Sequence, residues 1–394
     1  RNPPDRPPVI APKRKLMKDP ILPPASLGMI GGGQLGRMFT MAAKTMGYQV
    51  VVLEPERDCP AASIADRHIC ARYDDAEALS ELANACHAVT TEFENVPASS
   101  LELLARTVRV APSAKSVSIA QDRICEKAFL TRAGLDVAPY LEVENLEKLD
   151  TDLSSYLPGI LKVARLGYDG KGQIRVSTAA ETIEAFSSLG NQACVLEKML
   201  DLRLEVSVIV ARTGEDAVTT FPVAENRHEN GILDVSIIPA RIHDQLAESA
   251  RNIALRVADA LDYVGVLGVE MFILGDDRIL VNEIAPRPHN SGHYTLDATL
   301  SSQFEQQVRT LCGLPPASTK LLSPCVMVNL LGDLWNKNDP NWMNLLEDPR
   351  VLLHLYGKHS ARPGRKMGHF NLLAENLAEA LDTAIELKLE LNSH

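Results

Sequence analysis

A strand, a glycine turn, a helix and a second strand follow one another near the start of the chain, and this order constrains the fold more than any other feature. Residues 27–53 contain two apolar runs that flank three consecutive glycines and a stretch with helical periodicity. Such a βαβ unit needs a parallel sheet, because the crossover helix lets both strands run in the same direction. Residues 75–107 continue the pattern with helix, strand and helix. We therefore predict a doubly wound α/β domain over residues 26–115.

The remainder of the chain has a different, strand-rich pattern. A helix predicted over residues 116–133 leads into short apolar runs separated by glycine turns, and an amphipathic helix is predicted over residues 243–261. After two prolines at 315–316, short strands precede a last helix at 377–391. This pattern is typical of α+β units. The predicted boundaries are 116–312 for a two-lobed unit with a hinge near 197–200, and 318–394 for a small β-rich C-terminal domain.

The first 25 residues match neither pattern. Residues 1–24 hold eight of the 24 prolines, and residues 1–18 hold six basic side chains against one acidic side chain. Proline fixes φ and has no N–H group, so such a segment forms neither a helix nor a strand ladder. We expect residues 1–25 to be a disordered arm or, before Met17, which looks like a natural start, to be sequence that is not native.

The charge balance argues against a nucleic-acid partner. Lysine and arginine total 40 and aspartate and glutamate total 51, which gives a formal net charge of -11. Proteins that bind polyanions usually carry a basic surplus, and those that bind single strands add stacking aromatic side chains, but aromatic residues make up only 5% of this chain. We therefore expect no nucleic acid among the partners.

Hydropathy and cysteine usage indicate the compartment. No apolar run approaches the roughly 18 to 20 residues that span a bilayer, and the N-terminus has no apolar signal core. The seven cysteines are scattered without a C-x-x-C pair, which indicates neither a disulfide framework nor a thiolate metal site. We expect a cytoplasmic protein with no membrane contact.

The first glycine turn has two interpretations. Residues 31–36 read GGGQLG, follow a strand and open a helix, and Glu54 lies 21 residues after Gly33 at the end of the next strand. This matches the dinucleotide fingerprint, in which the acidic residue binds a ribose hydroxyl, and so predicts NAD or FAD. Alternatively, the glycines only allow the helix to pack on the sheet, while the helix N-terminus holds another anion.

Two glutamates are predicted to face each other across a hairpin. If Asp276 and Asp277 form a two-residue turn, Glu270 and Glu283 lie directly opposite each other, with Cβ atoms about 5 Å apart. Two carboxylates this close repel, so they need a proton or a cation between them, and hard oxygen ligands suit Mg²⁺. Asn282 could add a further oxygen. The alternative is that one or both glutamates point to solvent, or that a bulge shifts the register.

Further along, a second glycine loop and a lysine indicate phosphate binding. The loop 167–172 lies between two strands, and its backbone N–H groups can wrap phosphate oxygens with help from Lys171, although a flexible hairpin turn explains it equally well. Lys162 lies in an apolar strand, where an ammonium needs an anion. Residues 197–200 could read an adenine edge and Glu205 could bind ribose; an ordinary linker and a surface acid are the alternatives.

Four sequence strings, in this order, resemble the 5-(carboxyamino)imidazole ribonucleotide synthase family of the ATP-grasp superfamily. They are GGQLGR at 32–37, GYDGKGQ at 167–173, NEIAPRPHNSGH at 282–293 and RPGRKMGH at 362–369. The resemblance covers residues 26 to about 373. It implies an ATP-grasp fold, preceded by a Rossmann-like domain and followed by the small C-terminal domain. It also implies carboxylation of 5-aminoimidazole ribonucleotide with ATP and bicarbonate, releasing ADP and phosphate, in purine biosynthesis.

The resemblance also assigns site residues, and it implies a homodimer. ATP is expected at Arg123, Lys162, Gly167, Tyr168, Asp169, Gly170, Lys171, Gly172, Gln173, Glu197, Lys198, Met199, Leu200, Glu205, His228, Asn282 and Glu283. Mg²⁺ is expected at Glu270 and Glu283. The ribonucleotide, rather than NAD, is expected at Gly33, Gln34, Leu35, Glu94, Asp169, Lys358, Arg362 and Arg365.

Three residues are predicted to carry the chemistry. Lys162 would take up charge on the transferred phosphoryl group, Arg287 would hold the oxyanions of carboxyphosphate, and Asp169 would accept the amine proton. One alternative is another ATP-grasp carboxylate–amine ligase, such as a formate-dependent transformylase. The others are an NAD-dependent oxidoreductase and a regulator that binds nucleotide without turnover.

Overall fold

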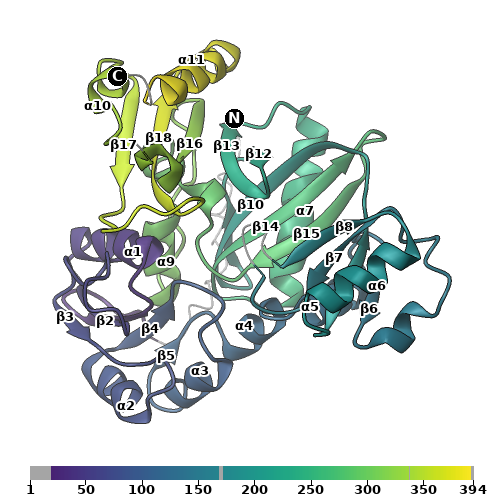
Figure 1. The fold of residues 1–394 in the computed structure, drawn as a ribbon. Helices are drawn as coiled ribbons and strands as arrows, with labels where there is room; N and C mark the ends of the chain where they lie inside the picture. The colour runs from purple at the N-terminus through teal and green to yellow at the C-terminus, as the bar shows by residue number, and fades with distance from the viewer. Residues whose placement is uncertain (1–18, 168–171, 337, 392–394) are drawn as a thin grey trace, which may run out of the picture.

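The computed structural model describes residues 19–167, 172–336 and 338–391, and these residues form three sheets (Figure 1). A parallel sheet and its helices make up the N-terminal part. A small antiparallel sheet and a large sheet follow, and the predicted site lies where these parts meet. The predicted arm is described only from residue 19 onward.

The N-terminal sheet is parallel and has helices on both faces. Its strand order is β3-β2-β1-β4-β5. Alternate residues of β1 and β2 point to opposite faces, so Leu27 and Val50 pack toward α1 and α9, while Ile30 and Val51 pack toward α2 and α3. The predicted doubly wound domain is confirmed. Its elements are β1 (Ser26–Ile30), α1 (Gln34–Thr45), β2 (Gln49–Leu53), β3 (Arg67–Ile69), α2 (Ala76–Ala85), β4 (Ala88–Thr91), α3 (Ala98–Leu104), β5 (Arg109–Val110) and α4 (Ala114–Ala120).

The small sheet is antiparallel and carries helix α6 on one face. Its strand order is β6-β9-β7-β8. Leu161 of β7, Leu196 of β9 and Phe186 of α6 share its hydrophobic core. The elements are α5 (Arg123–Arg132), β6 (Tyr140–Val143), a 3-10 turn (Leu146–Leu149), β7 (Gly159–Val163), β8 (Gln173–Val176), α6 (Ala179–Ser188) and β9 (Cys194–Lys198).

The large sheet continues from the central unit into the C-terminal segment, because β13 pairs with β16 (Figure 1). Its order is β15-β14-β10-β12-β13-β16-β18-β17, and β11 pairs with β10. Helix α7 packs against β10 and β14, and α11 packs against β16 and β18. The elements are β10 (Leu202–Gly214), β11 (Ala217–Thr220), β12 (Ala224–Glu229), β13 (Ile232–Ile238), α7 (Asp244–Ala260), β14 (Gly265–Leu274), β15 (Ile279–Ala285), a 3-10 turn (Asn290–Gly292), α8 (Thr295–Ala298), α9 (Gln303–Leu311), β16 (Cys325–Leu331), a 3-10 turn (Gly332–Trp335), α10 (Trp342–Leu346), β17 (Val351–Leu355), β18 (Lys366–Leu373) and α11 (Leu377–Glu390).

The single helix predicted over 116–133 is wrong, because the structure has two helices there, α4 and α5. Asp122 separates them: its backbone is extended, and its carboxylate accepts hydrogen bonds from the N–H groups of Ile124 and Cys125. An aspartate at this position stabilises a new helix start, which the apolar periodicity alone does not reveal. Within the described parts of the chain, no helix combines the length and apolar character needed to cross a bilayer.

The β14–β15 hairpin has the predicted pairing but not the predicted turn. Glu270 pairs with Glu283, as expected. The turn, however, leaves residues 275–278 between the strands, with Asp277 at a positive φ of 64°. Beyond it, Met271 pairs with Val281, so one extra residue, Asn282, is inserted before Glu283. The longer turn and the bulge offset each other, which restores the predicted pair.

Candidate active site

The centre of the site is the carboxylate pair on the edge hairpin of the large sheet. Oε1 of Glu270 lies 3.1 Å from Nε2 of His289, and Oε2 of Glu283 accepts a hydrogen bond of 3.1 Å from Nη1 of Arg123. Burial and the charge of Glu283 raise the pKa of Glu270 to about 7. Burial would also raise the pKa of Glu283, but Arg123 and Lys162 outweigh it and lower that pKa. The two carboxylates therefore do not carry two full negative charges near neutral pH.

His289 is a neutral imidazole in contact with Glu270. Burial and the nearby charge of Arg287 lower the pKa of His289 well below its usual value. Its Nδ1 accepts from the backbone N–H of Ser291 and lies 2.8 Å from the Ser291 hydroxyl. The proton is thereby assigned to Nε2, the nitrogen that lies 3.1 Å from Oε1 of Glu270.

Lys162 does meet an anion in this structure, and the anion is a side chain of the protein. Its Nζ lies 3.0 Å from Oε2 of Glu197, and Nζ of Lys127 lies 3.4 Å from the same oxygen. Burial opposes the ionised form of Glu197, but the two lysines outweigh it and lower its pKa to about 2. Glu197 is 3% exposed and Lys127 is 1% exposed. The sequence interpretation missed Lys127, which lies on α5 four residues after Arg123.

The predicted ribose-binding acid is paired with the predicted nucleotide histidine. Nδ1 of His228 on β12 lies 2.8 Å from Oε2 of Glu205 on β10. Burial would lower the pKa of His228, but the contact with the Glu205 carboxylate and the charge of Glu270 outweigh it and raise that pKa. Glu205 lies on β10, which is next to β14, and His228 lies on β12, which is next to β10. Ser207 pairs with Glu270 and Glu205 pairs with Asn226, so alternation along the strands puts Glu205 and His228 on the face that carries Glu270.

The first glycine turn binds carboxylates of the chain itself. Gly33 and Gly36 donate their backbone N–H groups to Glu92 at 2.8 and 2.6 Å, and Gly32 donates to Glu54 at 2.8 Å. A Cβ atom on Gly36 would come within 2.5 Å of the backbone carbonyl oxygen of Gly31, which explains the need for glycine there. The N–H groups that would bind a dinucleotide pyrophosphate are thus already engaged, which favours the second interpretation of the turn. Glu92 directly follows β4 and was not predicted.

Gln34 and Leu35 form the first residues of α1, after this turn. Leu35 is buried against Phe304 and Tyr356, whereas Gln34 is partly exposed. Lys358 comes from the C-terminal loop, where its Nζ donates to the carbonyl of Lys366 at 2.7 Å, and its charge acts on Glu92. This brings Lys358 to the glycine turn from a position far along the chain.

Arg362 and Arg365, which were also predicted for the ribonucleotide site, are less directly placed. Nη1 of Arg365 donates to the carbonyl and hydroxyl oxygens of Ser360 at 2.8 Å. Arg362 has an exposed side chain, and its backbone packs against Gly332. The charge of Lys358 therefore acts on the glycine turn through Glu92, whereas the hydrogen bonds of Arg365 stay within its own loop.

Arg287 and Glu94 form an ion pair between the N-terminal domain and the loop after β15. Nε of Arg287 donates to Oε2 of Glu94 at 2.5 Å, and Nη2 donates to Oε1 at 3.3 Å. Both residues were predicted as site residues, and the structure joins them. Burial would raise the pKa of Glu94, but the charge of Arg287 outweighs it and lowers that pKa.

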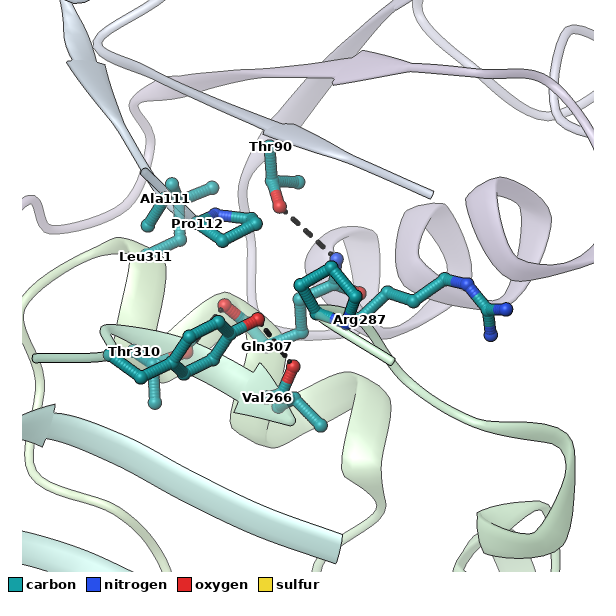
Figure 2. A pocket seen from close by; sticks show the side chains of 11 residues that line it. Thr90, Ala111, Pro112, Val266, Arg287, Gln307, Thr310 and Leu311 are labelled. Carbon is teal, nitrogen blue, oxygen red and sulfur yellow. Dashed lines mark hydrogen bonds between the residues drawn. The ribbon is translucent and has the colours of Figure 1, made fainter. Parts of the chain in front are cut away.

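The pocket in Figure 2 includes Arg287 in its lining and is a packing junction. Gln307 of α9 donates to the hydroxyl of Thr90 at 3.1 Å, while the Arg287 side chain extends away from both residues. The space has no room for a water-sized molecule, so it cannot hold a nucleotide. It shows instead that α9 fixes the N-terminal domain beside the large sheet.

Several predicted nucleotide-binding residues lie on the small sheet and its links. Arg123 reaches the Gly167 carbonyl at 3.5 Å, and the N–H groups of Lys198 and Met199 donate to Pro139 and Pro158. Gly172 accepts from the N–H of Val163, Gln173 begins β8, and Leu200 lies between β9 and β10. Tyr168, Asp169, Gly170 and Lys171 lie outside the described residues, so their predicted roles are not placed.

The residues suit a divalent cation that completes its shell with other ligands. No cluster of three or more His, Cys, Asp or Glu side chains suited to a metal occurs within residues 19–167, 172–336 and 338–391. The site offers instead two facing carboxylates, one of which has a pKa raised to about 7 by burial and by its neighbour. A cation between them would remove that repulsion, and Mg²⁺ commonly takes one or two carboxylates plus phosphate oxygens and water.

Three family models together match most of the chain. An ATP-grasp domain matches residues 128–304, a ribonucleotide synthetase preATP-grasp domain matches residues 25–121, and a phosphoribosylaminoimidazole carboxylase C-terminal domain matches residues 325–383. These matches confirm the predicted fold class, with an ATP-grasp fold between an N-terminal and a C-terminal domain.

Curated relatives and solved structures agree with these models. The N5-carboxyaminoimidazole ribonucleotide synthase of Brucella melitensis is 48% identical over 89% of this chain and 97% of its own length, and that of Bacillus subtilis is 43% identical over 91% and 94%. A crystal structure of an N5-carboxyaminoimidazole ribonucleotide synthetase in complex with ADP has a TM-score of 0.88 at 44% identity, covering 94% of this chain and 98% of that one. The Aspergillus clavatus enzyme in complex with ADP and 5-aminoimidazole ribonucleotide has a TM-score of 0.84 at 31% identity, covering 93% and 98%. The chain belongs to the N5-carboxyaminoimidazole ribonucleotide synthase family of ATP-grasp enzymes.

Proposed function

We propose that the protein uses ATP and bicarbonate to carboxylate the exocyclic amine of 5-aminoimidazole ribonucleotide. The observation that carries the proposal is the buried Glu270–Glu283 pair, flanked by Arg123 and near Lys162. A facing carboxylate pair beside two cations suits a nucleotide polyphosphate bound with a divalent cation. The family membership and the solved relative with ADP and the ribonucleotide support the same substrates.

The proposed chemistry has three steps. An oxygen of bicarbonate attacks the γ-phosphorus of ATP, the bond to ADP breaks, and carboxyphosphate forms. Carboxyphosphate then splits into CO₂ and phosphate. The exocyclic amine nitrogen attacks CO₂ and loses a proton, which Asp169 is proposed to accept. A closed site protects carboxyphosphate from water, so the activated carboxyl group is not returned to bicarbonate before it reaches the amine.

The chain's cations and hydrogen bonds position the reactants in this scheme. Lys162 is close enough to Glu197 to form an ion pair, so a phosphate must compete with a carboxylate of the chain for the same ammonium. Arg287 offers a planar guanidinium suited to the two oxygens of a carboxyl group, and Glu94 fixes its orientation. Lys358, beside the glycine turn, is proposed to bind the 5′-phosphate of the ribonucleotide.

Glu270 and Glu283 are the residues proposed to hold Mg²⁺. When bound, Mg²⁺ would supply positive charge against the phosphoryl oxygens. Arg123 donates a hydrogen bond to Glu283, and His289 lies 3.1 Å from Glu270, so each carboxylate already contacts a side chain of the protein.

A phosphate-release assay tests the proposal. Purified protein with ATP, Mg²⁺, bicarbonate and 5-aminoimidazole ribonucleotide should release phosphate faster than a control without the ribonucleotide. An equal rate in both mixtures would refute the activity. Replacing bicarbonate by formate separates the proposed reaction from that of a formate-dependent transformylase, which would be active with formate.

A cytoplasmic homodimer without nucleic-acid or membrane partners completes the proposal. The family resemblance supports the dimer, and the net charge of -11 supports the absence of nucleic acid. Sedimentation of the purified protein tests the assembly, and a sedimenting mass near 43.0 kDa would show a monomer instead.

A further inference from the structure

The β-bulge in β15 decides where Glu283 points. Near the turn, β14 and β15 pair in one register, which ends with Met271 opposite Val281. The next pair is Glu270 with Glu283, so the register shifts by one residue and Asn282 is the extra residue of β15. Without this extra residue, Asn282 would face Glu270, because a one-residue slip turns every side chain to the other face. The carboxylate pair therefore exists only while the bulge is held in place.

The bulge lies on an edge strand, so its outward backbone groups need partners from outside the sheet. The N–H of Val281 donates to the carbonyl of Asp136 at 2.8 Å. The carbonyl of Asn282 accepts from Nζ of Lys127 at 3.1 Å, and the N–H of Ile284 donates to Oε1 of Glu126 at 2.7 Å. Two neighbouring side chains of α5 thus bind the residues on either side of Glu283.

The same helix also contacts Glu283 and the small sheet. Arg123, one turn before Lys127, donates to the Glu283 carboxylate. Lys127 additionally lies 3.4 Å from the carboxylate of Glu197 on β9. Glu126 and Lys127 are both almost fully buried, and a buried ionisable side chain is costly unless hydrogen bonds compensate for its lost hydration. Their partners are backbone groups of the bulge and a buried carboxylate.

We infer that Glu126 and Lys127 are positioning residues, which hold the bulge of β15 so that Glu283 faces Glu270. Lys127 also ties the bulge to Glu197, so the carboxylate pair and the predicted nucleotide hinge keep a constant relative position. The inference rests on the proposed role of the pair as a divalent-cation site. It assigns to α5 a function in the geometry of that site, in addition to the nucleotide contact expected of Arg123.

Binding of Mn²⁺ in the presence of ADP tests the inference without relying on turnover. Free Mn²⁺ is measured by electron paramagnetic resonance for the wild type, Lys127→Met, Glu126→Leu and Glu126→Gln. Lys127→Met removes the ammonium but keeps an unbranched side chain, and Glu126→Leu removes the acceptor. Both should weaken Mn²⁺ binding by about tenfold or more, as expected when the support of a metal ligand is lost. Glu126→Gln keeps an acceptor oxygen and should stay within about threefold of the wild type, well short of that loss.

Arg132→Met is the matched control, because it removes an exposed cation from the same helix. It should bind Mn²⁺ as the wild type does. Folded Lys127→Met and Glu126→Leu proteins that bind Mn²⁺ within twofold of the wild type would overturn the inference. Failure of both to fold, judged by circular dichroism, would also overturn it, since the two residues would then determine the fold rather than the site. Wild-type protein that binds Mn²⁺ with ADP but releases no ribonucleotide-dependent phosphate would refute the proposed function and leave this test intact.

Discussion

Glu270 and Glu283 face each other across β14 and β15, and their surroundings shift their pKa values in opposite directions. Burial and the neighbouring carboxylate raise the pKa of Glu270 to about 7, whereas Arg123 and Lys162 overcome burial and lower the pKa of Glu283. In the metal-free protein the pair therefore holds one proton over much of the acidic range, and that proton resides on Glu270.

We expect the affinity for a divalent cation to rise with pH through about 7. The cation needs Glu270 ionised, so below this value it must displace a proton, and affinity should fall by up to about tenfold per pH unit. Titrating Mn²⁺ with ADP from pH 5.5 to 8.5 measures the effect. A flat profile would contradict it. Glu270→Gln should remove both the pH dependence and most of the affinity.

Glu283→Gln should abolish turnover without unfolding the protein. The amide keeps the volume of the side chain, and it loses the negative charge that pairs with Arg123 and is proposed to hold Mg²⁺. We expect the rate of phosphate release to fall by about 100-fold or more, because metal ligands contribute several kcal/mol to transition-state stabilisation. Asp276→Asn, in the exposed turn of the same hairpin, should keep the wild-type rate. Unchanged activity in Glu283→Gln would remove this residue from the site.

The stability of the ligand-free protein should fall as pH rises, in part because of Glu92. Burial raises the pKa of Glu92 to about 7 in the folded protein, whereas a glutamate in an unfolded chain titrates near about 4.3. Between these values the folded state holds the extra proton, so the free energy of unfolding decreases with rising pH. Calorimetric Tm values from pH 4.5 to 8 should show a shallower decline for Glu92→Gln than for the wild type. The exposed Glu102→Gln variant should keep the full decline, and equal slopes in all three proteins would contradict this assignment.

Arg287→Lys should impair the use of the ribonucleotide and bicarbonate more than the binding of nucleotide. Lysine keeps the charge, but it cannot make the two-bond contact with Glu94. We expect kcat/KM to fall by about tenfold to 100-fold, the cost of one or two charge-assisted hydrogen bonds. Binding of ADP should change little. If Glu94 acts only by orienting Arg287, the Arg287→Lys/Glu94→Gln double variant should be no worse than the worse single variant.

The sequence predicted the carboxylate pair because strand pairing obeys a simple register rule. Glu270 and Glu283 were placed opposite each other by counting from an assumed two-residue turn at Asp276 and Asp277. The structure has a longer turn and a compensating bulge at Asn282. Bulges depend on partners outside the sheet, here on α5, so the local sequence of the hairpin could not reveal this one.

Residues that act through side-chain contacts between distant segments were harder to predict. Lys127 and Glu92 bind groups that lie far from them in sequence, Asn282 and the glycine turn respectively. A signal for Lys127 was nevertheless present: Arg123, Glu126, Lys127 and Leu130 have the spacing of one helix face. Because Leu130 belongs to the hydrophobic core, the charged residues on that face must be buried with partners.

The continuity of the large sheet determines which part of the molecule can move during a catalytic cycle. An unbroken ladder connects β15, which carries Glu283, through β13 and β16 to β18, which begins at Lys366 beside the loop of Lys358. The carboxylates proposed to hold Mg²⁺ and the lysine proposed to bind the 5′-phosphate therefore lie on or beside one continuous sheet, which keeps the distance between them constant. The small sheet is joined to the large sheet by the link between β9 and β10 and by side chains of α5. When the active site opens and closes, the small sheet should move relative to the large sheet, and the large sheet should keep the bound reactants at a constant spacing.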